Sequence, residues 1–320
     1  MYDAVSNTAE VVAAVLGIAV TVVAIIVQLA ATRFNHRIST LFAREPVNIL
    51  VLSFFVLTAV LCVWVSATTS EGSHPDLHRF VMVMVTLSLL ALLPYFAYVF
   101  SFISPLNVIA RIKRQALKQL RACTGSFDEG KRLRTARTVD ELQDVLRGAI
   151  DASDRDIAMA CVDALTDLLE TYTTLRAQLP AAWHSMSEAL SSDPDFVSLE
   201  DSAIQRINAQ SLWFEYKIFS QLHATVDLVI PHLRDVANLV SIRTRQIAVG
   251  AADRNPDLLS LALTAFNSYL RATIRARDPR TAYYVLSQYR QTAEVLARKG
   301  CDDQVLEITR RLSFYAQFSF

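Results

Sequence analysis

The segment FVMVMVTLSLLALLPYFAYVFSFI, residues 80–103, carries no charged side chain and is long enough to cross a membrane as one helix. At 1.5 Å per residue, about twenty residues span a hydrocarbon core of roughly 30 Å. Two further runs, VVAAVLGIAVTVVAIIVQLAA (residues 11–31) and VNILVLSFFVLTAVLCVWVSA (residues 47–67), have the same character. A charged side chain at the bilayer centre costs about 2.5–3.5 kcal/mol. The sequence therefore predicts an all-α protein with three transmembrane helices in a membrane domain of residues 1–104.

The first run is predicted to be a retained span and not a cleaved signal peptide. Residues 1–10 contain Asp3 and Glu10 but no lysine or arginine, so the positive start of a signal peptide is missing. The apolar run also exceeds the usual length of a signal peptide and is followed by Arg33, not by a cleavage site of small residues.

The basic residues predict the direction of the spans, because short loops rich in lysine and arginine stay on the cytoplasmic side. The first loop carries three arginines and one acidic residue, whereas the second carries one arginine and two acidic residues. After the third span, five basic residues precede the first acidic one: Arg111, Lys113, Arg114, Lys118 and Arg121. We therefore expect the N-terminus outside and the chain beyond Ser104 in the cytoplasm.

The segment that follows the third span is basic and amphipathic. Apolar residues recur at helical spacing over residues 106–120, and the basic residues fill the positions between them. Such a helix is suited to lie on anionic lipid headgroups. The same pattern also fits a helix that packs on its own domain and is basic only because cytoplasmic segments next to a span are rich in lysine and arginine. The sequence does not decide between the two.

Polar side chains within the spans are candidates for contacts inside the membrane. Thr21 and Gln28 lie in the first run, and Gln28 is near its cytoplasmic end. Polar residues at such positions either hold helices together or line a pathway. Packing is the favoured interpretation, since threonine also bonds to the preceding turn of its own helix.

The rest of the chain is predicted to be helical, with a juxtamembrane helix and linker over residues 105–137 and an all-helical cytoplasmic domain over residues 138–320. Thr138 opens a T-V-D-E capping box, and Asp193-Pro194, Asn255-Pro256 and Asp278-Pro279 each place a capping side chain before a proline. We expect helices over residues 107–122, 139–151, 155–178, 196–229, 232–249, 257–276, 280–299 and 302–318.

A weak internal repeat appears within this domain. Residues 150–158 (IDASDRDIA) align without gaps to residues 274–282 (IRARDPRTA), and in both an aspartate precedes a long helix. Repeated helical hairpins that bury their faces on one another, as in α-solenoids, produce such a signal. Shared capping chemistry alone explains it equally well.

The sequence lacks the motifs that usually carry chemistry. It contains no phosphate-binding glycine loop, no H-E-x-x-H and no G-x-S-x-G. Its four cysteines, Cys62, Cys123, Cys161 and Cys301, are far apart and form no metal-binding pair. Equal numbers of basic and acidic residues, 31 each, argue against nucleic-acid binding. We therefore expect no catalytic residue, cofactor or metal.

One stretch resembles a known family. QLAATRFNHRISTLFAREPVNILVLSFFVLTAVLCVWV (residues 28–65) is similar to the start of the domain-of-unknown-function 2254 family of predicted bacterial membrane proteins, in which a span runs into a Gln-Phe-Ser-Pro-Arg-like turn before a second span. Phe34 and Arg37 match that turn, and the two residues between them depart from it. Typical members carry one more span before the one that opens here.

A second stretch near the C-terminus resembles the same family. Asp278, Pro279, Thr281 and Ala282 match its Asn-Asp-Pro-x-Thr-Ala segment, with Arg277 where the family has asparagine. The resemblance implies a bacterial inner-membrane protein and brings no established activity with it.

The function we expect is that of a non-enzymatic membrane scaffold or accessory subunit. Its cytoplasmic helices would bind another protein or another copy of the chain, and its basic segment would contact anionic lipids. The alternative is an oligomeric channel or transporter whose pore is lined by the three spans. The spans lack the charged residues that often mark ion pathways, which favours the first hypothesis.

Overall fold

The computed structural model describes residues 14–15, 17–18, 20–25, 28, 46–68 and 75–318. These residues form helices joined by turns, and no strand occurs among them. In chain order, the helices after the first described residues are α3 (Pro46–Thr68), α4 (Pro75–Ile103), α5 (Pro105–Ala122), α6 (Glu129–Asp151), α7 (Arg155–Leu175), the short 3-10 helix η1 (Arg176–Gln178), α8 (Ala181–His184), α9 (Glu188–Ser191), α10 (Pro194–Val197), α11 (Asp201–Ala209), α12 (Trp213–Val229), α13 (Arg234–Ala251), α14 (Pro256–Arg275), α15 (Pro279–Arg298) and α16 (Asp302–Phe318).

The chain divides into two compact units, Met1–Val108 and Ile109–Phe320, which we call the membrane unit and the helical unit. The division falls within α5, four residues after the predicted end of the membrane domain at 104.

Among the described residues of the membrane unit, two helices are long and apolar enough to cross a bilayer. These segments are Pro46–Val65 within α3 and Arg79–Ser101 within α4, which agree with the second and third predicted spans. The two helices pack through small clusters, in which Cys62 and Val65 meet Val81 and Val85. About half of the predicted span over residues 11–31 lies outside the described residues; those of its residues that are described are helical.

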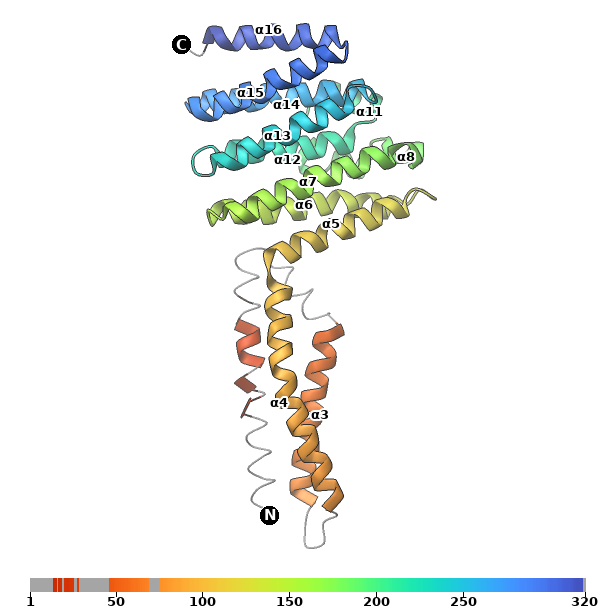
Figure 1. The fold of residues 1–320 in the computed structure, drawn as a ribbon. Coiled ribbons are helices and arrows are strands. Elements are labelled where there is room, and N and C mark those ends of the chain that lie inside the picture. Colours follow the sequence, from red (N-terminus) through yellow and green to blue (C-terminus); the bar gives the residue numbers. More distant parts are fainter. Residues whose placement is uncertain are drawn as a thin grey trace. The chain divides into compact units, whose positions relative to one another are not determined.

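The helical unit is built from consecutive helices that pack on one another in layers, visible in Figure 1 as α6 with α7, α12 with α13, and α14 with α15, followed by α16. Layers also contact their neighbours, since α12 packs on α6 and α14, and α13 packs on α7 and α15. Each helix therefore buries an apolar stripe between layers, as in helical repeat proteins.

Four turns between these helices have the same geometry. In each, one residue adopts a left-handed conformation: Ser153 (φ 55°), Ser211 (φ 57°), Arg277 (φ 53°) and Gly300 (φ 74°). The amide of the next residue donates to a carbonyl five residues back, as Asp154 does to Ala149 (2.8 Å) and Asp278 to Thr273 (3.0 Å). This is the Schellman motif.

The two segments that echo each other in sequence form the same turn. Asp154 and Asp278 each close a Schellman motif through the backbone amide and then cap the next helix through the side chain. One residue thus ends a helix and starts another. The internal repeat reflects a repeated helix–turn–helix geometry within the described residues.

The three predicted Asx-Pro helix starts are confirmed. Asp193, Asn255 and Asp278 cap α10, α14 and α15, with proline at the first turn of each helix. The predicted start at Thr138 is wrong, because α6 begins at Glu129 with Asp128 as its cap. Thr138 is buried in the middle of α6 and donates to the carbonyl of Arg134 (2.7 Å).

The single helix predicted over residues 196–229 is also wrong, since this stretch forms α10, α11 and α12. The break before α12 is the Schellman turn at Ser211. A non-glycine residue in the left-handed region costs about 1–2 kcal/mol, so serine is not a residue that predicts such a turn. The sequence around Ser211 therefore gives no local indication of the break. Arg176, from another part of the chain, donates to the carbonyl of Ser211 (3.1 Å) and supports the turn.

Candidate functional site

A buried pair of opposite charges lies at the junction of α7, η1 and α12. Glu215 is fully buried, and one of its oxygens accepts a hydrogen bond from Arg176, which also donates to the hydroxyl of Tyr172 (3.2 Å). Burial raises the pKa of Glu215 to about 7, although Arg176 acts in the opposite direction. The second oxygen, Oε2, is buried with no hydrogen-bond partner, which suits a neutral acid better than a carboxylate.

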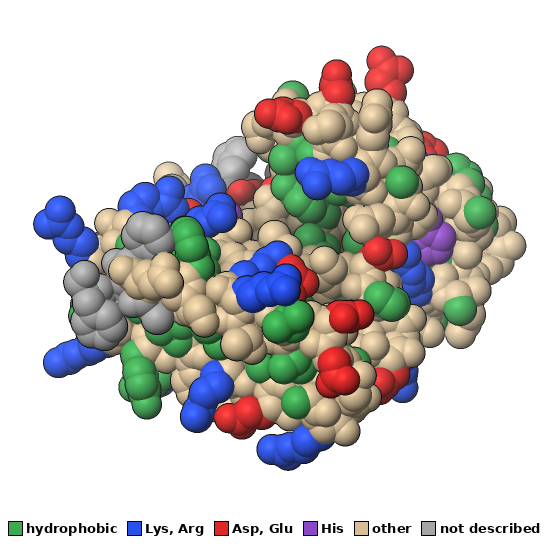
Figure 2. Space-filling model, turned by 90° about the horizontal axis from the view of Figure 1, so that it is seen from above, with side chains coloured by type: hydrophobic (Ala, Val, Ile, Leu, Met, Phe, Trp, Pro, Cys, Tyr) green, Lys and Arg blue, Asp and Glu red, His purple; other side chains and the backbone are tan. Residues whose placement is uncertain are grey.

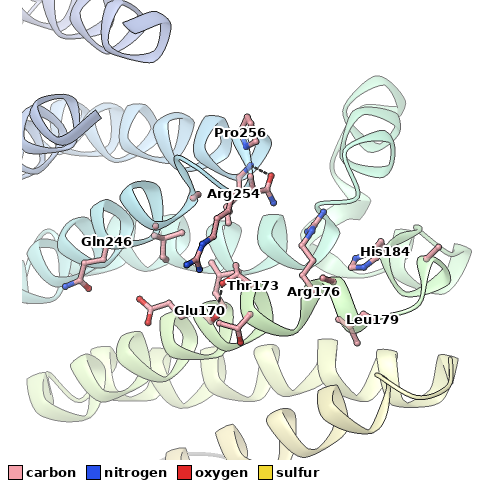
Figure 3. Close-up of a pocket in the computed structure, with 17 residues that line it drawn as sticks. Glu170, Thr173, Arg176, Leu179, His184, Gln246, Arg254 and Pro256 are labelled. Atoms are coloured by element: carbon pink, nitrogen blue, oxygen red, sulfur yellow. Dashed lines mark hydrogen bonds between the residues drawn. The ribbon is translucent and has the colours of Figure 1, made fainter. Parts of the chain in front are cut away.

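A pocket of about 850 Å³ opens beside this pair (Figure 3). Its walls come from α7, η1, α8, α13 and α14, so it lies between layers of the helical unit. In Figure 3, Arg176 and His184 line one side, and Arg254 points into the space above Thr173 and Glu170. Apolar residues complete the lining: Leu169, Leu179, Ile247 and Leu258.

The polar groups of this pocket are mostly engaged by the protein itself. Arg176 is held by Glu215, and Thr173 donates to the carbonyl of Glu170 (2.7 Å). Burial and the nearby Arg176 lower the pKa of His184, so its ring is neutral at pH 7. Arg254 is exposed and forms no ion pair among the described residues. The pocket therefore offers a cation and apolar walls, which suit binding better than catalysis.

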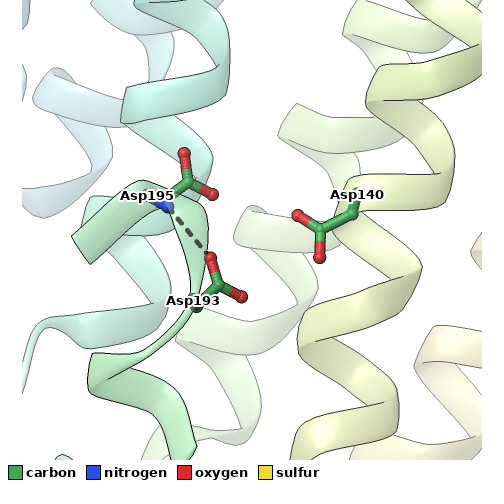
Figure 4. Close-up of side chains that lie close together, drawn as sticks. All are labelled: Asp140, Asp193 and Asp195. Atoms are coloured by element: carbon green, nitrogen blue, oxygen red, sulfur yellow. Dashed lines mark hydrogen bonds between the residues drawn. The ribbon is translucent and has the colours of Figure 1, made fainter. Parts of the chain in front are cut away.

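A second cluster gathers three carboxylates around one lysine. Asp140 on α6 and Asp193 and Asp195 around α10 lie close enough to share a metal ion (Figure 4). The fully buried ammonium of Lys217 occupies their centre, at 2.6 Å from Asp140 and 2.7 Å from each of the other two. Ser220 and Gln221 also donate to Asp195 (2.8 and 2.6 Å).

The electrostatics of this cluster indicate a structural role. Burial alone lowers the pKa of Lys217, but Asp140 and Asp195 outweigh that effect and raise it, so the ammonium stays charged. Burial raises the pKa of Asp140 to about 6. An ammonium group with three carboxylate acceptors is an internal counter-ion, and it links α6 and α10 to α12.

The predicted membrane-surface residues lie on α5, and the apolar side of this helix is covered by protein. Ile109, Ala116 and Leu120 are buried, and Lys113 forms an ion pair with Asp167 of α7 (2.5 Å). A helix cannot insert an apolar stripe into lipid when that stripe is already packed. The basic side chains that remain exposed are Arg114, Lys118 and Arg121, while Arg111 is half-buried.

The two polar candidates in the first run are placed differently. The hydroxyl of Thr21 donates to the carbonyl of Gly17 in its own helix (2.7 Å), and Gln28 is exposed. A polar contact that the sequence did not suggest joins the two described spans, where the hydroxyl of Tyr95 donates to Asn48. Both residues are buried, and the bond holds α3 to α4 in apolar surroundings.

The C-terminal family-like residues form a helix start. Asp278 accepts from the backbone amide of Thr281 (3.4 Å), from its hydroxyl (2.9 Å) and from Arg234 (2.6 Å). Although burial acts in the opposite direction, these hydrogen bonds hold the pKa of Asp278 below its usual value. Pro279 opens α15 and Ala282 is half-buried. Phe34 and Arg37 lie outside the described residues.

Comparison with known proteins identifies one family. Residues 2–147 match the model of a family described as "Predicted membrane protein (DUF2254)", which confirms the resemblance read from residues 28–65. The match ends before Asp278, so the likeness of the C-terminal segment to this family stays a prediction. No curated protein and no solved structure matches the chain.

Proposed function

Because residues 2–147 are those of a predicted membrane protein of the DUF2254 family, we propose that this chain is a non-enzymatic scaffold or accessory subunit of the bacterial inner membrane. The membrane unit anchors it, and the helical unit binds another protein or a second copy of the chain. The layered helical unit is the observation that carries this proposal, because stacked helical pairs present extended surfaces to partners.

The proposed topology has three spans, an external N-terminus and a cytoplasmic helical unit. Its support is the basic loop that holds Arg33, Arg37 and Arg44, together with the basic side chains of α5. A cysteine introduced at the exposed Ser260 should react with a membrane-impermeant maleimide only after the cells are permeabilised. Labelling in intact cells would place the helical unit outside.

The state of the buried charges supports a binding role over an enzymatic one. Glu215 and Lys217 are the fully buried carboxyl and amino groups of α12, and each is engaged by partners from other helices. Removing one partner of such a buried pair destabilises a fold by about 3–5 kcal/mol, which suits a structural role for these groups. The surface, and not the interior, is then where the helical unit acts.

An aromatic pair marks one candidate surface. Tyr283 and Tyr284, near the start of α15, are 70% and 47% exposed, and their rings meet edge to face with centroids 6.1 Å apart. Tyrosine is enriched among the residues that dominate protein interfaces. Two adjacent exposed rings therefore favour α15 as part of the contact with a partner.

The basic face of α5 supports contact with anionic lipid through charge alone. Arg114, Lys118 and Arg121 are exposed while the apolar side of α5 is packed. Each basic residue near an anionic membrane surface contributes about 1 kcal/mol. We propose that α5 rests against the headgroups without inserting.

A photo-crosslinking experiment in intact cells tests the binding role. A photoreactive amino acid at position 283 of the full-length protein should give one dominant adduct, either with a differently tagged copy or with one other protein identified by mass spectrometry. The same residue at Ser202, exposed on α11, is the matched control and should give none.

Two results would overturn this function. One is monomeric protein by native mass spectrometry in mild detergent together with no adduct at Tyr283. The other is ion flux in reconstituted liposomes that is lost on changing Gln28 or Thr21, which would favour the alternative of an oligomeric channel or transporter lined by the spans.

A further inference from the structure

A groove runs along the helical unit between α14 and α16 and reaches α12. It consists of two adjoining hollows of about 330 and 410 Å³ that share Ser268 and Arg271. The first also contacts His223 and Arg275, and the second extends between the helices to Arg310 and beyond. We call this feature the basic groove; its other lining residues are Thr264, Asn267, Arg311, Phe314 and Tyr315.

The groove is rich in arginine, although Asp227 lies beside its first hollow, 3.7 Å from His223. Four arginines and one histidine line it, and its lining contains no carboxylate. Arg275 and Arg311 have acidic neighbours, Asp227 (2.9 Å) and Glu307. Arg271 and Arg310 form no ion pair among the described residues, so two guanidinium groups are available to an anionic ligand. In Figure 2, which shows the face that carries α16, Lys and Arg side chains gather toward the left beside apolar ones.

A buried acceptor in the groove provides an independent observation. Asn267 is 7% exposed, and its amide nitrogen donates to the carbonyl of Leu263 (3.0 Å). Its oxygen, Oδ1, is buried and accepts no hydrogen bond. An unpaired buried acceptor costs about 1–3 kcal/mol, and a ligand donor would relieve that cost once the Asn267 side chain turns into the groove.

These groups point to a ligand with both anionic side chains and backbone N–H donors. Carboxylate or phosphate groups suit Arg271 and Arg310, a peptide N–H suits Asn267, and the half-exposed ring of Phe314 suits an apolar side chain. A free anion or a nucleic acid backbone would supply the charge but no regular N–H donor. The open, elongated form of the groove also suits an extended segment.

We propose that the basic groove binds an extended acidic segment of a partner protein, rich in aspartate and glutamate or phosphorylated. This proposal rests on the protein-binding role proposed above and specifies the chemistry of the partner. The segment lies between α14 and α16, with its oxyanions on Arg271 and Arg310.

Binding of labelled peptides to the full-length protein in mild detergent tests the proposal. Fluorescence anisotropy would compare a fluorescein-labelled poly-glutamate peptide, a phosphoserine peptide and a neutral poly-glutamine peptide. The acidic peptides should bind, with an affinity that falls as salt is added, because exposed charges are screened. The difference between the first two distinguishes carboxylate from phosphate as the recognised group.

Charge reversal identifies the groove as the site. The double variant Arg271→Glu/Arg310→Glu should weaken binding of the acidic peptides by about tenfold or more, since attraction becomes repulsion. Arg147→Glu, an exposed arginine on α6 without an ion pair among the described residues, is the matched control and should bind as the wild type does. Circular dichroism shows whether each variant is folded.

The results separate this inference from the function on which it rests. Equal binding by the double variant, equal binding of poly-glutamine, or tighter binding of a single-stranded oligonucleotide would each overturn the acidic-segment proposal. If no acidic peptide binds while the adduct at Tyr283 persists, the groove proposal fails and the scaffold role stands. If the peptide binds and the adduct is absent, the helical unit uses the groove and not the tyrosine pair.

Discussion

The membrane unit and the helical unit are both helical, but they place their apolar side chains on opposite sides. Leu50, Trp64 and Leu93 of the spans are 69%, 69% and 74% exposed, whereas Trp183 and Trp213 of the helical unit are fully buried. Burial of apolar area from water is worth about 25 cal/mol per Å², but lipid offers no such gain. The contrast teaches that the solvent of each unit, and not helix propensity, decides which side of a helix is apolar.

The two units also satisfy polar groups differently. In the spans, hydroxyls donate to their own helix, as Thr58 does to Phe54 (2.9 Å) and Thr86 to Met82 (2.8 Å). In the helical unit, ion pairs such as Arg243 with Asp163 (2.7 Å) join different helices. Among the described residues, the spans thus join to each other through one neutral hydrogen bond, from Tyr95 to Asn48, whereas ion pairs join the helices of the helical unit.

The largest effect expected from this difference is that of removing Lys217. The change Lys217→Met leaves three carboxylates together without a counter-charge and should destabilise the helical unit by about 3–5 kcal/mol. Urea unfolding of the full-length protein in detergent, followed by tryptophan fluorescence in a Trp64→Phe background, reports on Trp183 and Trp213. Lys118→Met, at an exposed site, should shift stability by less than about 0.5 kcal/mol. An equal loss of stability in both variants would contradict a structural role for the cluster.

A charged residue on the exposed side of a span should reduce insertion of the protein into the membrane. Leu93→Arg places a guanidinium where lipid is expected and should cost about 2.5–3.5 kcal/mol, lowering the membrane-inserted fraction after fractionation of cells. Leu306→Arg is the matched change on the exposed side of α16 and should leave insertion unaltered. Normal insertion of both variants would contradict the assignment of α4 as a span.

The buried Glu215 should make the stability of the helical unit depend on pH. Since its pKa rises from its ordinary 4.5 to about 7 in the folded protein, folding favours its protonated form. Its contribution is fully present below pH 4.5 and is lost as the pH rises through 7, a change of about 1–3 kcal/mol. In Glu215→Gln this part of the pH dependence should disappear. Asp140 acts in the same direction and His184 in the opposite one, so the comparison of variant with wild type isolates Glu215.

The smallest effect is expected at Asp278. Sequence reasoning predicts that Asp278→Asn leaves folding intact, because asparagine also caps helices. The structure adds the ion pair with Arg234 (2.6 Å), which the amide cannot replace, so a loss of about 1 kcal/mol is expected at pH 7. Because the pKa of Asp278 is lowered, this loss should vanish as the pH falls through that pKa. Unfolding at pH 7 and under acid conditions measures the difference.

Much of the fold follows from local signals in the sequence. The spans of α3 and α4 were predictable because hydrocarbon-length apolar runs have few other uses. The caps at Asp193, Asn255 and Asp278 were predictable because a capping side chain before proline favours a helix start. The start of α6 was missed because Thr138 carries a capping pattern inside a helix that tertiary packing extends back to Glu129.

The candidate sites were not predictable in the same way. The lysine cluster unites Asp140 and Lys217, which are far apart in the chain, and its only local signal was the cap at Asp193. The basic groove likewise joins Arg271 of α14 to Arg310 of α16, and nothing near either arginine in sequence announces the other. Such sites exist only once helices from separate segments have packed.

The sequence by itself determined the helical class, the apolar spans, most helix starts and the distribution of basic charge, because each of these depends on residues within one continuous segment. Only the tertiary structure decided that the apolar stripe of α5 is packed, that the chain turns at Ser211, and which charges meet around Lys217 and in the basic groove. The physical reason is the distance along the chain over which each effect acts. Helix propensity and the transfer of an apolar segment into lipid depend on neighbouring residues, whereas ion pairs and grooves depend on the relative placement of whole helices.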